Sequence, residues 1–437
     1  IDKKKFGTFF QPIPEGFDAN DIRTGKTQRC SVTGDTLKIT DVNRVEHLLD
    51  EGDTGEPPTW VKPIVKIQAE IGRRLNKAQS IATESVGPTP KKWVAPIGGS
   101  TKMGLLREND LYEEDFAPQT SMIRMLNDPK QFLEKEANGF QFYGGNEQPT
   151  KDNSEELKEF SELAGINSTD DQHRGFHRLG VARLDLDGLG SMVQQVKKSL
   201  AVNATLSIHL DVFLSGYVNT IRKNIRDGEG YLNILFSGGD DMLVVGRWDV
   251  VLDFVERVRS DFRQFIGGQD FCTLSAGIVL VTPKFPIGKA TIDAGEALEA
   301  AKAFNDMRKN AITFLGATVS WEKEFEEVKN QKNELAEWLK EGKISAGFLQ
   351  KMMQLQYIKD KHLLDSRMRD KPDLSYRWMT AWQFGRLAER VSEKTMREKI
   401  KKMGEDLFLS ERKYDLLALA ARWAELERRA AENNKSL

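Results

Sequence analysis

Two acidic clusters are the strongest candidates for chemistry in this sequence. Asp185 and Asp187 close one apolar run, while Asp240 and Asp241 stand between two further apolar runs. Carboxylates that gather at one place repel each other unless a cation lies between them, and oxygen ligands suit Mg²⁺ or Mn²⁺. Because two such ions about 3.5–4 Å apart can catalyse phosphoryl transfer, the pattern predicts the metal site of a nucleotidyl-transfer enzyme.

The second cluster follows a glycine pair, in the stretch Ser237–Asp241 (SGGDD). Gly238 and Gly239 allow positive backbone φ in a tight turn and leave room for a triphosphate beside the main chain. Ser237, Gly238 and Gly239 are therefore the nucleotide-contact candidates. A solvated hairpin tip would look the same locally, but the Asp-Leu-Asp of the first run favours the metal site.

The order of the surrounding elements predicts a ferredoxin-like βαββαβ palm, hence an α+β fold. The apolar runs on either side of the SGGDD turn read as a hairpin. The other expected elements are a strand at His177–Asp187, helical sequence to Ile225, a helix at Trp248–Ile266, a strand at Cys272–Val281, a helix at Ala290–Met307 and a strand at Ala311–Leu315.

The sequence on either side of the palm differs in character, which predicts three parts. Residues 1–150 are rich in turn formers and read as a mixed α/β linker region, with one helix over Trp60–Thr83. Residues 151–320 contain the palm, and residues 321–437 predict a domain of about five helices. We expect Trp378, Trp382 and Trp423 of those helices to lie in its core.

Composition excludes several classes of protein. The chain has 437 residues, 39% hydrophobic and 30% charged, with a net charge of −2, so nucleic-acid binding would need local basic patches. Two cysteines exclude a disulfide framework and favour a reducing cytoplasm. No apolar run approaches the roughly 18–20 residues of a membrane span, so we expect no membrane association.

The stretches RLGVARLDLDGLGSMV, YLNILFSGGDDMLVVGRW and KNAITFLG, in that order, resemble the second palm of the large subunit of type III CRISPR interference complexes. The resemblance implies conversion of ATP to cyclic oligoadenylates when the complex binds target RNA. It implies metal ligation by Asp185, the Leu186 carbonyl, Asp240 and Asp241, a triphosphate contact at Lys309 and adenine recognition at Ser207. The implied partners are other effector subunits, guide RNA and target RNA.

The sequence also departs from this family. No His-Asp nuclease dipeptide and no second paired-acid palm occur, so the chain is expected to begin near the linker between palms. Cys30 begins a knuckle whose second cysteine is replaced by Thr33, which makes zinc binding unlikely. Two alternatives stay open. One is a catalytically silent scaffold of the same complex. The other is a stand-alone cyclase of the GGDEF kind, although the Phe-Lys and Asn-Asp elements of that family are absent.

Overall fold

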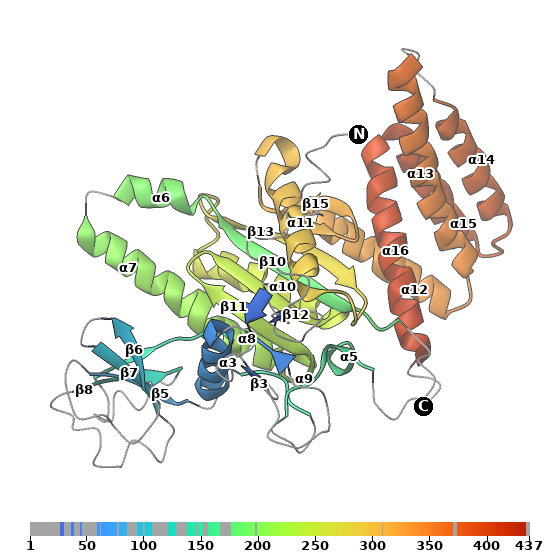
Figure 1. The fold of residues 1–437 in the computed structure, drawn as a ribbon. Helices are drawn as coiled ribbons and strands as arrows, with labels where there is room; N and C mark the ends of the chain where they lie inside the picture. The colour runs from blue at the N-terminus through green and yellow to red at the C-terminus, as the bar shows by residue number, and fades with distance from the viewer. Residues whose placement is uncertain are drawn as a thin grey trace. The chain divides into compact units, whose positions relative to one another are not determined.

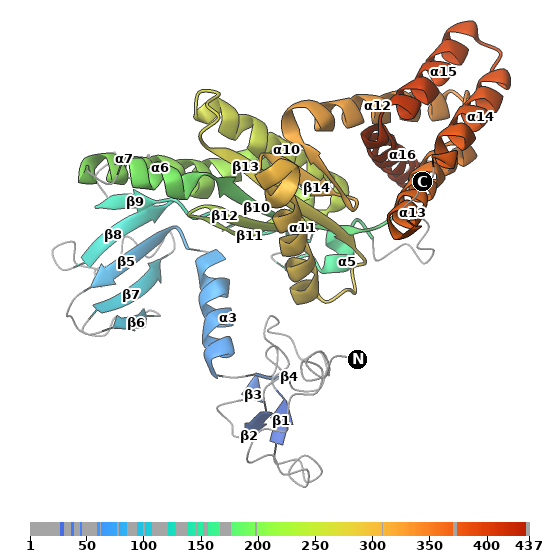
Figure 2. The ribbon, with the colours of Figure 1, turned by 90° about the horizontal axis from the view of Figure 1, so that it is seen from above.

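The computed structural model shows two compact units, Ile1–Gln141 and Phe142–Leu437. The structure describes residues 27–29, 36–38, 44–45, 59–61, 63–76, 78–84, 94–98, 101–106, 121–127, 138–145, 147–151, 156–166, 176–196, 199–307, 309–369 and 374–433. Figures 1 and 2 show the ribbon from two directions. The expected three-part division stays a prediction.

The first unit is mixed α/β, as expected. A five-stranded sheet has the order β6-β7-β5-β8-β9, and two short pairs, β1-β2 and β3-β4, lie earlier in the chain. The bounds are β1 Thr27–Arg29, β2 Thr36–Lys38, β3 Arg44–Val45, β4 Thr59–Trp60, α3 Pro63–Asn76, β5 Ser80–Glu84, β6 Val94–Gly98, β7 Thr101–Leu106, β8 Ser121–Leu126 and β9 Gly139–Gln141.

The helix expected over Trp60–Thr83 is wrong at both ends, since Trp60 lies in strand β4 and the helix begins at Pro63. The helix stops at Asn76, and Ser80–Glu84 forms the central strand β5. Ser80 and Ala82 are buried on one face of this strand, a two-residue period that pairing with β7 and β8 selects over a helix.

The second unit begins with the predicted palm. Its six-stranded sheet has the order β11-β12-β10-β13-β14-β15. The first four strands give the ferredoxin-like arrangement, and β14 adds parallel to β13. The bounds are α5 Phe160–Leu163, β10 Leu179–Asp187, α6 Leu189–Val196, α7 Leu200–Asp211, the π-helix η3 Val212–Tyr217, α8 Val218–Asn224, α9 Gly228–Tyr231, β11 Leu232–Gly238, β12 Asp241–Arg247, α10 Trp248–Phe265, β13 Thr273–Val281, α11 Ile287–Met307, β14 Ala311–Phe314 and β15 Ala317–Ser320.

Helices cover both faces of this sheet (Figure 1). Because side chains alternate along a strand, the two faces of β10 pack into two different hydrophobic clusters. Leu179 and Val181 pack with Ala290 and Ala294 of α11. Leu184, from the opposite face, belongs to the larger core that also holds α10. The face under α11 is the one that carries the odd-numbered acids, Asp185 and Asp187.

Five α-helices follow the palm in the described part of the chain, which confirms the helical C-terminal region. They come after the π-helix η4, Trp321–Phe325, and are α12 Glu326–Lys340, α13 Ala346–Arg369, α14 Ser375–Glu389, α15 Lys394–Leu409 and α16 Glu411–Asn433. The palm and these helices share one core, in which the rings of Phe314 and Trp423 meet edge to face at 5.6 Å.

The expectation that the three tryptophans of the C-terminal helices lie in the core is only partly right. Trp423 is buried, but Trp378 and Trp382 are 70% and 60% exposed. These two lie one turn apart on α14, whose buried residues include Tyr376, Thr380 and Phe384. The two tryptophans therefore lie on the solvent-exposed side of α14. The opposite side of this helix packs against α13 and α15.

Candidate active site

The two acidic clusters meet at one end of the sheet. In the antiparallel ladder between β10 and β12, Asp185 lies directly opposite Asp241. The N–H of Leu186 donates a hydrogen bond to the carbonyl of Asp240 at 3.0 Å, which continues the pairing into the turn. Directly opposed residues project to the same face, so the structure places the predicted ligands Asp185 and Asp241 side by side.

Two basic side chains, which sequence reasoning missed, hold these carboxylates. Arg183 Nη2 lies 2.6 Å from Asp241 Oδ2, and Lys302 Nζ, from α11, lies 3.0 Å from Asp185 Oδ2. Arg183 stands two residues before Asp185 on the same strand face, a spacing visible in the sequence. Lys302 carried no such signal, because only packing of α11 on the sheet brings it to Asp185.

Burial and the ion pair between Asp185 and Lys302 shift the pKa values of both groups. Burial raises the pKa of the Asp185 carboxyl, and the charges of Asp240 and Asp187 act in the same direction, against the opposing effect of Lys302. Burial lowers the pKa of Lys302, but its hydrogen bond and attraction to Asp185 prevail and raise it. A cation that binds Asp185 must therefore compete with the ammonium group of Lys302.

The donor set fits a hard divalent cation. Oδ1 of Asp241 is a buried oxygen with no hydrogen-bond partner among the described residues, and such an atom is costly unless something binds it. Asp185 and Asp240 supply further oxygens nearby. Within the described part of the chain, however, no three acidic, histidine or cysteine side chains already form a ligand cluster, so the carboxylates would have to draw together.

The hairpin turn confirms a positive φ at Gly239 but not at Gly238, which is the last residue of strand β11. β11 ends at Gly238 and β12 begins at Asp241, which leaves Gly239 and Asp240 as a two-residue turn. Gly239 has φ = 70°, and a side chain placed there would meet no atom within 4 Å. The turn therefore leaves open space beside its backbone, as the approach of a triphosphate requires.

Ser237 lies below the turn rather than on its open side. It is 8% exposed, and its hydroxyl donates a hydrogen bond to the carbonyl of Leu214 in the π-helix η3. Widened helix turns leave carbonyls without their usual partners, and this hydroxyl satisfies one of them. The contact attaches β11 to η3, while the predicted contact of Ser237 with nucleotide stays a prediction.

The other two predicted contacts lie on different elements. Lys309 is half-buried in the turn between α11 and β14, next to Asn310, whose backbone N–H donates to Asp187 Oδ2 at 3.1 Å. This places Lys309 beside the acidic end of β10. Ser207 lies exposed on α7, and within the described residues no hydrogen bond links it to the acids. Its predicted role in adenine recognition stays a prediction.

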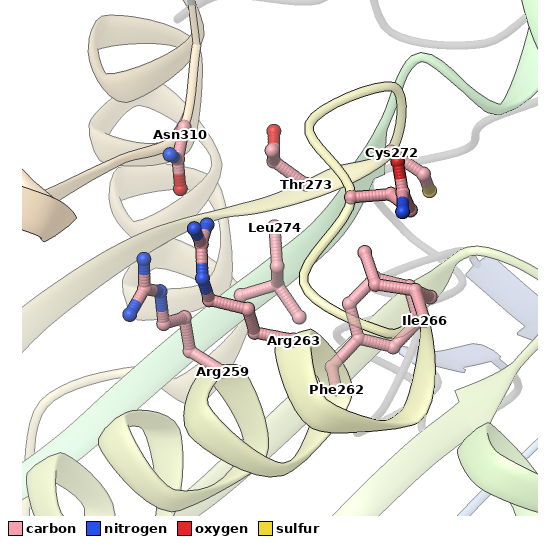
Figure 3. Close-up of a pocket in the computed structure, with 9 residues that line it drawn as sticks. Arg259, Phe262, Arg263, Ile266, Cys272, Thr273, Leu274 and Asn310 are labelled. Atoms are coloured by element: carbon pink, nitrogen blue, oxygen red, sulfur yellow. The ribbon is translucent and has the colours of Figure 1, made fainter.

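A small pocket borders the turn between α11 and β14 (Figure 3). Arg259 and Arg263 of α10 point into it, and Asn310 and Thr273 border it. Its volume of about 10 Å³ holds roughly one water molecule. The pocket is thus far too small for a nucleotide.

Two further points concern the zinc knuckle and a membrane-spanning helix. Cys30 and Thr33 lie outside the described residues, so the structure says nothing of the zinc knuckle. None of the described helices combines the length and apolar character that a bilayer crossing requires.

Residues 178–313 match the family model of the second palm domain of Cas10/Cmr2. The chain is 31% identical over 193 residues to a protein of Methanocaldococcus jannaschii named as the CRISPR system single-strand-specific deoxyribonuclease Cas10/Csm1 of subtype III-A. The identity is 34% over 142 residues for the protein of the same name from Enterococcus italicus. These matches cover 40% and 32% of this chain, but only 24% and 18% of the two relatives.

Solved structures agree on the fold. Csm1 of T. onnurineus superposes with a TM-score of 0.54 at 20% identity, over 79% of this chain and 49% of that one. A Csm1–Csm4 cassette in complex with pppApApA gives 0.58 at 19% identity, over 83% and 51%. The chain therefore spans about half the length of these structural relatives.

Proposed function

We propose that this chain joins ATP molecules into cyclic oligoadenylates. Its residues 178–313 match the second palm of the Cas10/Cmr2 family, and we take the chain to be part of a Cas10-like type III large subunit. One observation carries the proposal: the ladder between β10 and β12 sets Asp185 against Asp241, beside a turn with open space at Gly239. Solved Csm1–Csm4 cassettes include complexes with cA4 and with one ATP, which favours ATP as the substrate.

The proposed reaction is a nucleotidyl transfer. The 3′-oxygen of one ATP attacks the α-phosphorus of the next, forms a phosphodiester and releases pyrophosphate, while the hydroxyl proton leaves to base or water. Asp185, the Leu186 carbonyl, Asp240 and Asp241 would hold Mg²⁺ or Mn²⁺. When bound, such ions supply charge stabilisation for the attacking and leaving oxygens. Lys309 would contact the triphosphate.

The similarity to type III CRISPR large subunits also supports a proposal about the complex in which the chain works. We place the chain in a ribonucleoprotein with guide RNA and other effector subunits, and we expect target RNA to switch the palm on. The relatives are named as single-strand-specific deoxyribonucleases; we propose an activity only for the palm, residues 178–313.

The ion pairs of Arg183 and Lys302 favour a second candidate. Because they neutralise two of the acids without any metal, the palm could fold as a silent scaffold. A scaffold would hold RNA and partner subunits yet turn over no ATP. A stand-alone cyclase of the GGDEF kind would instead be active without RNA.

The decisive test uses the assembled complex that contains this chain. We expect ATP, Mg²⁺ and complementary RNA together to yield adenylate oligomers by mass spectrometry, and Asp240→Ala with Asp241→Ala to abolish them. Asp270→Ala is the matched control, because Asp270 is an exposed acid of the same palm and should leave turnover unchanged. Absence of oligomers from the unaltered complex would favour the scaffold, and synthesis without RNA the stand-alone enzyme.

A further inference from the structure

Asp187, the second acid of β10, has surroundings unlike those of Asp185. It is 3% exposed. Its Oδ2 accepts hydrogen bonds from Thr273 Oγ1 at 2.9 Å, Ser275 Oγ at 2.7 Å and the backbone N–H of Asn310 at 3.1 Å. One carboxylate oxygen thus joins the end of β10, the start of β13 and the turn before β14.

That turn has an unfavourable backbone. Lys309 and Asn310 have φ of 59° and 50°, the left-handed region that residues with a Cβ atom seldom occupy and rarely in succession. Such conformations persist where surrounding contacts hold them, and they concentrate at functional sites. Among the described residues, the side chain that bonds to the backbone of this turn is Asp187.

The contacts of Asp187 Oδ2 differ from those of the acids assigned to the cation. Asp185 and Asp241 each pair with a basic side chain, whereas Asp187 receives two hydroxyls and one amide. Its Oδ2 is fully used by these three donors, while its Oδ1, like Oδ1 of Asp241, is buried with no hydrogen-bond partner among the described residues. Hydrogen bonds to a charged acceptor are among the stronger ones in proteins, so this oxygen is well suited to hold a strained turn.

We propose that Asp187 is a positioning residue, whose buried carboxylate holds the Lys309–Asn310 turn in its left-handed form and so presents Lys309 to the triphosphate. The proposal rests on the proposed function, because it takes Lys309 as the triphosphate contact. Asp187 then acts on the triphosphate contact through its Oδ2 and the turn. Loss of its carboxylate would release the turn and remove the contribution of Lys309.

The test is a double-mutant cycle on the full chain. Binding of a non-hydrolysable ATP analogue with Mg²⁺ is measured by calorimetry for the wild type, Lys309→Ala, Asp187→Ala and the double variant. We expect each single change to weaken binding about tenfold to a hundredfold, the usual cost of a hydrogen bond to a charged group. The double variant should be no weaker than either single variant, because both act through one contact.

Two further variants exclude a general loss of structure. Asp270→Ala removes an exposed acid of the same palm and leaves every donor to Asp187 in place, so it should bind the analogue within about twofold of wild type. Asn310→Gly, placed in the Asp187→Ala background, should partly restore binding, since glycine adopts positive φ without strain. Amide exchange of the segment that starts at Lys309 should accelerate in Asp187→Ala and not in Asp270→Ala.

The outcomes separate the two proposals. If Lys309→Ala binds the analogue as well as wild type, the triphosphate role of Lys309 fails and this inference fails with it. If Lys309→Ala weakens binding while Asp187→Ala does not, or the two effects add, only the positioning role is overturned. Unchanged amide exchange in Asp187→Ala would overturn it independently of nucleotide.

Discussion

The substitution Gly277→Ala tests how α11 is seated on the palm. Gly277 lies in β13 opposite Arg183. A Cβ atom there would fall 2.2 Å from the Leu298 nitrogen and 2.6 Å from the Ala294 carbonyl oxygen. Both atoms belong to the backbone of α11, so no rotamer change relieves the overlap and the helix must move from the sheet.

The expected cost follows from that overlap. Overpacking a core costs about 1–3 kcal/mol, occasionally more, and the backbone clash places this case at or above the upper end. Unfolding entropy is about 2.1 cal/mol/K per residue, so for the unit Phe142–Leu437 a loss of 3 kcal/mol lowers the melting temperature by roughly 5 °C. Since α11 carries Lys302 to Asp185 and leads into the Lys309 turn, nucleotide binding should weaken as well.

The assay is thermal unfolding followed by circular dichroism, with nucleotide binding on the same samples. The matched control is Gly288→Ala on α11, where an added Cβ meets no atom within 4 Å. That change should be neutral or should stabilise by up to about 1 kcal/mol through helix propensity. A melting temperature of Gly277→Ala within about a degree of wild type would refute the close packing of α11 on β13.

Two further predictions concern side-chain hydrogen bonds elsewhere in the second unit. Burial raises the pKa of Glu324, but hydrogen bonds from Arg412 and Ser320 outweigh it and lower the pKa below its ordinary 4.5. Stabilisation by this pair is therefore present above pH 4.5 and is lost as the pH falls through the folded pKa. Glu324→Gln should cost about 1–3 kcal/mol at neutral pH and progressively less in acid, as measured by urea unfolding; a difference independent of pH would contradict the assignment. Ser237→Ala should cost about 1–3 kcal/mol, because the buried Leu214 carbonyl loses its donor; weaker ATP binding at unchanged stability would instead assign the hydroxyl to the nucleotide.

The sequence determined the palm and its acidic hairpin. The strand and helix periods around Asp185 and the glycine turn are local signals, and the βαββαβ order allows few arrangements of strands. The two-residue turn sets the register of β11 against β12, whereas the register of β10 against β12, which opposes Asp185 and Asp241, depends on how β10 packs into the sheet. The same local signals misplaced the end of the first helix, because Ser80–Glu84 suits a helix or a strand until it meets β7 and β8.

Tertiary structure decided which other groups reach the acids. Lys302 is far from Asp185 in sequence, and only the packing of α11, made possible by Gly277, brings the two charges to 3.0 Å. Asp187 looked like a partner of Asp185 in one cluster, yet hydroxyls from β13 and an amide before β14 give it different contacts. Sequence patterns report the period of an element, whereas the partners of a side chain depend on how separate elements pack.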